Sequence, residues 1–174
     1  YFLCNNIYAG AAILLSEFIQ VSIKNTTFLK NCGMNVPSGI IIAETSELSS
    51  LELDGVSFEE TFSVRISSNN NLTSEKGVCI TIKSALKMNI LNSLFRNNFM
   101  GGKTLNIKDV GSTVINSINE RTEILIFSSI FVLNRGLFKS NVILAIGKKL
   151  EINFCFFSQN FPSNENSPTQ GGIY

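Results

Sequence analysis

The stretch LNSLFRNN, residues 91–98, places a phenylalanine three residues before an asparagine. The same F-x-x-N spacing recurs along the chain, in the pairs Phe2 and Asn5, Phe28 and Asn31, Phe95 and Asn98, Phe131 and Asn134, and Phe157 and Asn160. A further copy keeps Phe58 but carries Thr61 where the others carry asparagine. The six phenylalanines are 26, 30, 37, 36 and 26 residues apart. A period of this length indicates a stack of similar structural units, some of them with insertions.

Two aliphatic columns precede the phenylalanines from Phe28 onward. The first stands seven residues before the ring and contains Val21, Leu51, Met88, Ile124 and Leu150. The second stands five residues before it and contains Ile23, Leu53, Ile90, Ile126 and Ile152. Because alternate side chains of a strand face the same side, this spacing predicts a short strand with one apolar face. The Asn, Gly and Ser residues that follow, among them Asn25 and Asn92, are typical of a turn.

A second block lies between the copies and consists of a glycine followed by a short alternating strand, starting at Gly10, Gly39, Gly77 and Gly102. Short strands of this kind are stable when coils stack about 4.8 Å apart, so that each strand pairs with its equivalents. We therefore predict an all-β fold, a parallel β-helix solenoid of about five to six coils. Residues 1–174 form one β-helix segment in this prediction, and residues 63–76 and 109–122 form surface insertions.

The stack assigns a role to each position of the motif. We expect one interior ladder of aromatic rings, made by Phe2, Phe28, Phe58, Phe95, Phe131 and Phe157. We expect a second ladder of hydrogen-bonded amides, made by Asn5, Asn31, Asn98, Asn134 and Asn160. Buried amides that bond along the axis and to turn backbone avoid the cost of unpaired polar groups. By the same reasoning we expect Asn25 to be a buried, hydrogen-bonded turn residue.

The paired G-x-x-[ILV] and F-x-x-N motifs resemble the repeats of the polymorphic outer membrane proteins, a class of autotransporter. The pattern is also similar to pectin-lyase-like right-handed parallel β-helices and to β-helix surface proteins of protists. The resemblance implies a right-handed coil, an extracellular or cell-surface location, and a structural role in a fibre, stalk or adhesin. Thr61 in place of asparagine and Ser140 in place of a leading glycine depart from the motif.

A leucine-rich repeat is the alternative fold, because it also carries an asparagine ladder. Its L-x-x-L-x-L-x-x-N motif places the asparagine three residues after an aliphatic residue. Here Asn25 and Asn92 follow their aliphatic residues by two. The second block of each repeat is also strand-like, which favours the β-helix.

The supply of reactive residues argues against an enzyme. The chain has no histidine, and its two aspartates, Asp54 and Asp109, fall in different coils. Glu59 and Glu60 are adjacent, so on a strand their side chains face opposite ways and do not converge as an acid and a base. We therefore expect no catalytic site, no metal site and no cofactor. A polysaccharide-binding or polysaccharide-cleaving β-helix protein is the alternative function.

Charge and hydropathy restrict the partners. The net charge is +1 and the 14 basic residues are spread along the chain, which does not favour a nucleic-acid surface. No apolar run approaches the 18 or so residues of a transmembrane helix. Both ends fall inside a repeat, so we expect neighbouring copies or flanking coils of the same protein as partners. Glycans are a second class of expected partner.

The cysteines and sequons complete the set of candidate sites. Cys4, Cys32, Cys79 and Cys155 show no spacing typical of a metal or redox motif, and we expect four free, mostly buried thiols. In the expected register the Cα atoms of Cys4 and Cys32 are about 8 Å apart, beyond the reach of a disulfide. Asn71, within the first insertion, is the glycosylation candidate. Asn25 also begins a sequon, but a buried asparagine would be closed to a glycan.

Overall fold

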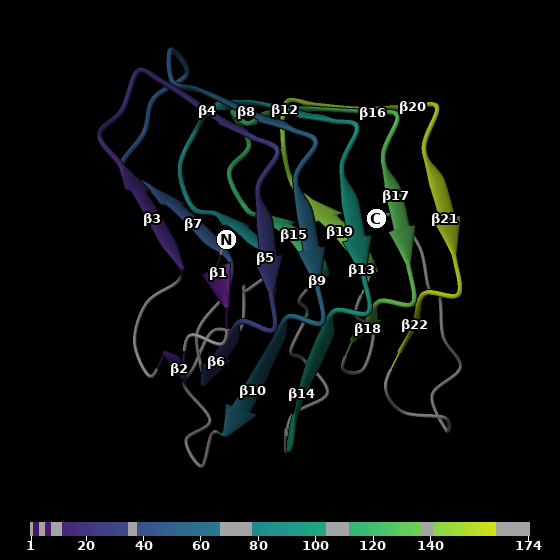
Figure 1. Cartoon of the computed structure of the whole chain (residues 1–174). Helices are drawn as coiled ribbons and strands as arrows, with labels where there is room; N and C mark the ends of the chain where they lie inside the picture. Colours follow the sequence, from purple (N-terminus) through teal and green to yellow (C-terminus); the bar gives the residue numbers. More distant parts are fainter. Residues whose placement is uncertain are drawn as a thin grey trace.

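The computed structural model describes residues 2–3, 6–7, 12–34, 38–66, 78–103, 112–136 and 141–162 of the chain. Every regular element within these ranges is a β-strand, and the strands form four sheets. Figure 1 shows the strands of each sheet side by side along one axis. No helix in the described ranges is long and apolar enough to cross a membrane.

Two sheets have six strands and two have five. Sheet A consists of β1 (Phe2–Leu3), β5 (Thr27–Leu29), β9 (Ser57–Glu59), β13 (Leu94–Arg96), β17 (Ile130–Val132) and β21 (Phe156–Ser158). Sheet B consists of β2 (Asn6–Ile7), β6 (Cys32–Met34), β10 (Phe62–Ile66), β14 (Phe99–Lys103), β18 (Arg135–Gly136) and β22 (Phe161–Pro162). Sheet C consists of β3 (Ile13–Ser16), β7 (Ile40–Ala43), β11 (Ile80–Ile82), β15 (Ser112–Ser117) and β19 (Asn141–Ala145). Sheet D consists of β4 (Gln20–Lys24), β8 (Ser50–Asp54), β12 (Lys87–Leu91), β16 (Glu123–Phe127) and β20 (Lys149–Asn153).

The chain visits the sheets in the order C, D, A, B and then returns to sheet C. We number these circuits as coils, so that coil 1 holds β3–β6, coil 2 β7–β10, coil 3 β11–β14, coil 4 β15–β18 and coil 5 β19–β22. Every strand pairs in parallel with its equivalents in the neighbouring coils. The fold is therefore a parallel β-helix solenoid, as the repeat predicts. The right hand of the coil stays a prediction, supported by the strong right-handed preference of parallel crossovers.

The aliphatic columns line the interior from sheet D. In β8 and β12 the side chains alternate, so that Leu51, Leu53, Met88 and Ile90 are buried while their neighbours are exposed or half-buried. Register pairs Leu51 with Met88 and Leu53 with Ile90, which keeps like residues in one column. Burial of an aliphatic side chain contributes about 1.5–3 kcal/mol relative to exposure. The columns therefore supply most of the energy that holds the coils in register.

The phenylalanine ladder lines the interior from sheet A. Its rings lie parallel, with centroids 4.4–5.3 Å apart and planes within 3–6° of one another, in the order Phe28, Phe58, Phe95, Phe131 and Phe157. This spacing follows from the strand spacing, because one ring stands on each coil. Phe2 pairs with Phe28 through its backbone, and its side chain lies outside the described part of the structure.

Each coil turns its corners with residues in the left-handed region. Between sheets D and A, φ is 47–62° at Asn25, Gly55, Asn92, Ser128 and Phe154. Between sheets A and B, φ is 51–57° at Lys30, Glu60, Asn97, Leu133 and Gln159. The first column includes Asn25, and the expectation that Asn25 is buried is wrong, because its side chain is exposed. Asparagine and glycine suit this column because they tolerate a positive φ.

The two expected insertions are shorter than the sequence suggests. Residues 63–66 continue β10 of sheet B, and residues 112–117 form β15 of sheet C. Val114 and Ile115 of β15 are fully buried, so this segment belongs to the core. The polar residues Ser112, Asn116 and Ser117 concealed its strand pattern in the sequence. Residues 67–76 and 109–111 lie outside the described residues.

Candidate functional site

A ladder of asparagine side chains runs along the corner between sheets A and B in coils 3–5. Its members are Asn98, Asn134 and Asn160. Each Nδ2 donates to the backbone oxygen of the ladder phenylalanine in the preceding coil, at 2.9–3.0 Å. Each Oδ1 accepts the backbone N–H of the equivalent corner residue in the preceding coil, at 3.0–3.2 Å. Neighbouring amides also bond Nδ2 to Oδ1 at 2.9 Å, so the ladder joins three coils along the axis.

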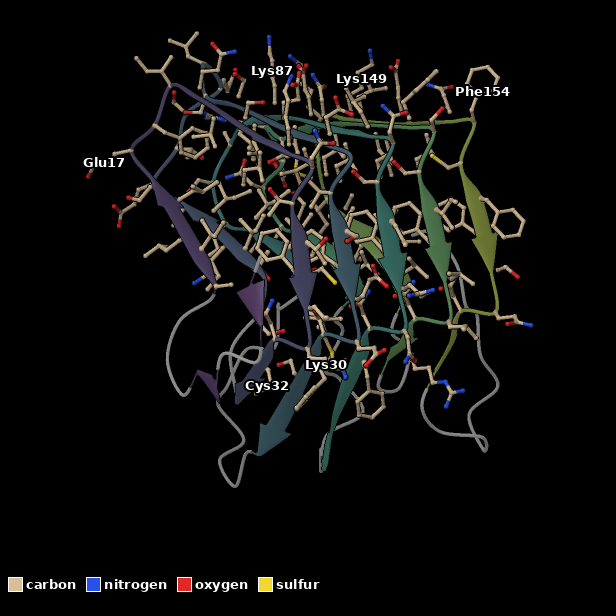
Figure 2. All side chains as sticks on the ribbon, in the orientation of Figure 1. Glu17, Lys30, Cys32, Lys87, Lys149 and Phe154 are labelled. Carbon is tan, nitrogen blue, oxygen red and sulfur yellow. The ribbon has the colours of Figure 1, made fainter. Side chains whose placement is uncertain are left out.

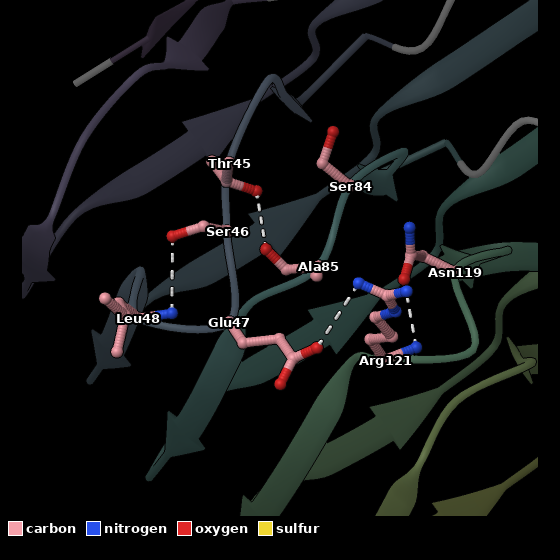
Figure 3. Close-up of a pocket in the computed structure, with 8 residues that line it drawn as sticks. All are labelled: Thr45, Ser46, Glu47, Leu48, Ser84, Ala85, Asn119 and Arg121. Carbon is pink, nitrogen blue, oxygen red and sulfur yellow. Dashed lines mark hydrogen bonds and ion pairs between the residues drawn. The ribbon is translucent and has the colours of Figure 1, made fainter.

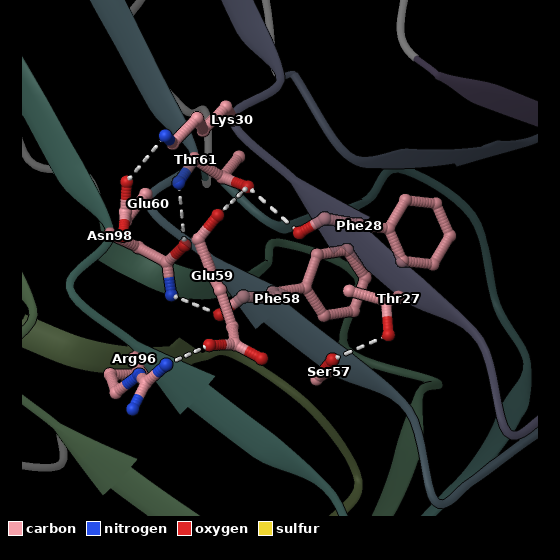
Figure 4. Close-up of polar contacts among 10 residues, drawn as sticks. All are labelled: Thr27, Phe28, Lys30, Ser57, Phe58, Glu59, Glu60, Thr61, Arg96 and Asn98. Carbon is pink, nitrogen blue, oxygen red and sulfur yellow. Dashed lines mark hydrogen bonds and ion pairs between the residues drawn. The ribbon is translucent and has the colours of Figure 1, made fainter. Parts of the chain in front are cut away.

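The ladder is interrupted in coil 2, where Thr61 occupies the corner (Figure 4). The Thr61 hydroxyl lies 3.5 Å from the backbone oxygen of Phe28, the atom that an asparagine amide would reach. Thr61 has no amide oxygen to accept from Asn31 in coil 1. The Nδ2 and Oδ1 atoms of Asn31 are fully buried and have no hydrogen-bond partner among the described residues. Asn5, the remaining expected member, lies outside the described residues.

A shallow polar groove of about 530 Å³ crosses the turns between sheets C and D in coils 2–4 (Figure 3). It is lined by Thr45, Ser46, Glu47, Leu48, Ser84, Ala85, Asn119 and Arg121. The Oε1 atom of Glu47 lies 3.7 Å from Nη1 of Arg121, so an ion pair bridges coil 2 and coil 4. The Thr45 hydroxyl donates to the backbone oxygen of Ala85 at 2.7 Å, which joins the coil 2 and coil 3 turns that line the groove.

The chemistry of this groove suits binding better than proton transfer. Glu47 and Arg121 are mostly exposed and offer a carboxylate and a guanidinium to a ligand in solvent. Ser46, Ser84 and Asn119 add hydroxyl and amide groups around them. Glycoside hydrolysis requires a second, facing carboxylate. Among the described residues that line the groove, Glu47 is the one carboxylate, and no second carboxylate faces it.

The adjacent glutamates at the corner of coil 2 point to different cations. Glu59 lies on β9 and forms an ion pair with Arg96 of the next coil. Glu60 forms an ion pair with Lys30 of the preceding coil, with 3.6 Å between Oε2 and Nζ. Figure 4 shows the two carboxylates separated in this way. Lys30, Glu60 and Arg96 are exposed and Glu59 is half-buried, and ion pairs at the surface contribute at most about 1 kcal/mol each.

The remaining acidic and sulfur-containing residues do not assemble into a site among the described residues. Asp54 accepts a hydrogen bond from the Asn92 amide at 2.9 Å, and Asp109 lies outside the described ranges. Across those ranges no three His, Cys, Asp or Glu side chains gather as metal ligands would. Cys32 and Cys79 are buried, and burial raises the pKa of the Cys79 thiol well above its usual value. Cys79 is therefore a packing residue and not a thiolate nucleophile.

Three further candidates complete this group. Cys155 is a half-buried free thiol on the corner between sheets D and A. Cys4 and the glycosylation candidate Asn71 lie outside the described residues.

An apolar strip follows the corner between sheets D and A in coils 3–5. Its members are Leu91, Leu94, Phe127, Ile130, Phe154 and Phe156. Strand register places these residues in adjacent rows, and the rings of Phe127 and Phe154 meet edge to face at 5.2 Å. Phe154 is 84% exposed and Phe156 58% exposed, and Figure 2 shows Phe154 at the outer edge of the molecule. Large exposed aromatic patches are uncommon on soluble monomers and mark contact surfaces.

Sequence reasoning missed this strip because it considered only the phenylalanines of the interior ladder. A usable signal existed in the register itself. The residue directly before each ladder phenylalanine must face outward, because neighbours on a strand point to opposite sides. Leu94, Ile130 and Phe156 occupy that position, whereas coils 1 and 2 carry Thr27 and Ser57 there.

In comparisons with known proteins, no family model, no curated protein and no solved structure matches this chain. The parallel β-helix therefore rests on the strand pairing alone. The likeness to pectin-lyase-like and autotransporter repeats remains an inference from the motifs.

Proposed function

We propose that this chain is a structural segment of a cell-surface or extracellular protein, such as a fibre, stalk or adhesin. Flanking coils of the same protein, or neighbouring copies, extend the segment along its axis. The proposal rests chiefly on the interior columns, in which like residues of successive coils pair in register along one axis. Ile124 and Ile126 are buried in coil 4, whereas Leu150 and Ile152 occupy the same columns of coil 5 and are half-buried.

This difference has a simple physical cause. Coil 4 has a described coil on each side, whereas coil 5 has a described coil on one side only. Phe157 shows the same pattern, because its ring stacks on Phe131 and the residue is half-buried. The proposed stacking requires such apolar columns and strand edges, because unpaired strand edges pair readily with a further strand.

Stacking between copies is tested by analytical ultracentrifugation across a concentration series. We expect the chain to form longer species as concentration rises. Leu150→Lys places a charge on the apolar face of coil 5 and should abolish that association. Glu151→Lys changes the outward-facing neighbour on the same strand and should leave it intact. A chain that sediments as a monomer at every concentration would rule out stacking between copies.

The location is tested on intact source cells with a membrane-impermeant amine reagent. Lys24, Lys87 and Lys149 are exposed on sheet D and would report labelling. We expect all three to be modified before the cells are lysed. Labelling that occurs only after lysis would contradict a surface or extracellular role, whatever the outcome of the sedimentation experiment.

The polar groove supports polysaccharide binding as a second candidate function. Its observation is the cluster of hydroxyl, amide, carboxylate and guanidinium groups across three coils. A polysaccharide and oligosaccharide array should then show binding that Arg121→Ala reduces at least about tenfold, equal to roughly 1.4 kcal/mol. Arg96→Ala, which removes an exposed arginine of sheet A, is the matched control. Equal binding by both variants would exclude the groove.

A further inference from the structure

Asn25 begins the sequon Asn25-Thr26-Thr27 at the corner between sheets D and A of coil 1. The structure reverses the expectation that this residue is buried, because Asn25 is exposed and takes a left-handed turn conformation with φ of 47°. Its backbone N–H donates to the backbone oxygen of Asp54 at 2.9 Å. The backbone of Asn25 is thus held in the stack, while its side-chain amide forms no hydrogen bond with the described residues.

The other residues of the same column show the direction in which the Asn25 side chain points. Asn92 and Ser128 are exposed, and Phe154, the largest member, is 84% exposed. A side chain as large as phenylalanine therefore projects into solvent from this column. In coil 2 the column holds Gly55, where an added Cβ would lie 2.7 Å from Oδ1 of Asn25. The Asn25 amide lies over this glycine on the outside of the corner and not in the core.

The hydroxyl that an N-glycosylation sequon requires belongs to Thr27 of β5. Thr27 faces the outer side of sheet A, next to the buried Phe28. Its Oγ1 accepts a hydrogen bond from the Ser57 hydroxyl at 3.1 Å (Figure 4). The asparagine and the hydroxyl residue of the sequon therefore both lie on the outer surface of coil 1.

We propose that Asn25 is an acceptor for an N-linked glycan. The donor class is an oligosaccharide joined to a lipid through a diphosphate. The Asn25 amide nitrogen forms a bond to the anomeric carbon of the first sugar, and the bond from that carbon to the phosphate oxygen breaks. The lipid diphosphate leaves with the bonding electrons, and the amide nitrogen gives up one proton to a base of the transferring enzyme. This proposal rests on the extracellular or cell-surface role and adds a modification site to it.

A glycan at Asn25 would lie over one half of the corner between sheets D and A. Coils 1 and 2 present Asn25, Thr27, Gly55 and Ser57, and the glycan would cover this polar half. The apolar strip of coils 3–5 starts one coil further along and stays uncovered. A glycan at Asn25 would therefore hydrate one half of the corner and leave the other half open to contacts.

The first test is cell-free translation of the chain, with a secretion signal, in the presence of endoplasmic-reticulum microsomes. Glycosidase digestion in ¹⁸O water marks each glycosylated asparagine as labelled aspartate, which mass spectrometry locates. We expect the label at residue 25, its loss in Asn25→Gln and Thr27→Ala, and its retention in Thr27→Ser. Asn92→Gln changes the same column outside a sequon and should have no effect. An unmodified Asn25 in chain imported into microsomes would overturn the proposal.

A second measurement tests the outward placement of the side chain. The glycosylated chain and its enzymatically deglycosylated form should unfold at the same temperature within about 2 °C, because a solvent-exposed glycan displaces no core group. A glycosylated chain that fails to fold would show that Asn25 belongs inside, and would also overturn the proposal. Neither failure bears on the structural role, which depends on labelling of intact cells. Conversely, if no lysine is labelled on intact cells, the proposed extracellular or cell-surface role fails, whereas the microsome result still stands.

Discussion

The corner between sheets A and B has two halves, which differ in how their polar side chains are hydrogen-bonded. In coils 3–5 each buried asparagine bonds to the coil before it, and Asn98, Asn134 and Asn160 form a continuous chain of amides. In coils 1 and 2 the chain is broken at Thr61, and the buried amide of Asn31 has no partner within the part of the chain that the structure describes. The strand register is nevertheless unchanged, because Phe28 still pairs with Phe58 and Phe58 with Phe95. The apolar columns therefore set the register, and the amide ladder adds stability to a coil that they already define.

The largest expected effect comes from breaking the continuous half. Asn134→Ala leaves the Asn98 backbone N–H and amide, together with the Phe95 carbonyl, without their bonds. An unpaired buried polar group costs about 1–3 kcal/mol, so we expect a loss on the order of 3 kcal/mol in the free energy of unfolding. Urea denaturation measures it. Thr61→Ala removes a hydroxyl whose hydrogen bonds, to the carbonyls of Phe28 and Glu59, are long at 3.5 and 3.4 Å. It should cost clearly less, so equal losses would refute the comparison.

Replacing the buried amide of Asn116 should raise the free energy of unfolding instead of lowering it. Asn116 on the outer face of β15 is fully buried, and neither its Nδ2 nor its Oδ1 has a partner in the described ranges. Its neighbours in the same column are Thr81 of coil 3 and Leu144 of coil 5. Asn116→Leu should therefore raise the free energy of unfolding by about 1–2 kcal/mol. A loss of stability in urea denaturation would show that the amide has a bonding role.

Repairing the broken half should give a smaller gain. Thr61→Asn supplies an Oδ1 in the position that accepts the backbone N–H and the amide of the preceding asparagine in coils 3–5. We expect Asn31 to gain a partner and the free energy of unfolding to rise by about 1 kcal/mol. Thermal unfolding would show an increase of a few degrees. The matched control Thr61→Val lacks any polar group and should lower stability, and a gain there would contradict the account.

The smallest effect is expected one residue before the ladder. Leu133 takes a φ of 57°, which a leucine adopts less easily than an asparagine. Leu133→Asn should raise the free energy of unfolding by about 0.5–1 kcal/mol, whereas Asn97→Leu in coil 3 should lower it by a similar amount. Thermal unfolding of the pair tests the expectation. Changes of the same sign would mean that side-chain packing and not the dihedral angle controls this column.

Much of the fold follows from the sequence, because burial imposes a period of two on each strand. The aliphatic pair and the ladder phenylalanine mark the core in every coil, and the strand pairing agrees with that alignment. Asparagine was harder to interpret, because it serves two physical needs in one repeat. The position of Asn98 requires a side-chain amide that forms buried hydrogen bonds. The positions of Asn25 and Asn92 require a residue that tolerates a positive φ on an exposed corner.

The variety within each column separates these two needs. The exposed column also holds glycine, serine and phenylalanine, which share neither polarity nor size. Such tolerance indicates a position where only the backbone is constrained. The polar groove could not be predicted from sequence, because its residues come from turns of three coils whose lengths differ. Asp54, Glu59 and Glu60 were judged from their spacing, but the cations that they meet depend on the register of adjacent coils.

The central claim is that coils stack in the register described here, and a cysteine cross-link tests it most directly. Glu52 and Asn89 face outward at paired positions of β8 and β12. Their Cα atoms should lie about 4.8 Å apart, within the 4.4–6.8 Å range of disulfides. Glu52→Cys combined with Asn89→Cys should therefore form a disulfide under mild oxidation, located by peptide mass spectrometry. Glu52→Cys combined with Lys87→Cys, offset by two residues and about 8 Å apart, should not. Preferential cross-linking of the offset pair would contradict the register and, with it, the ladder.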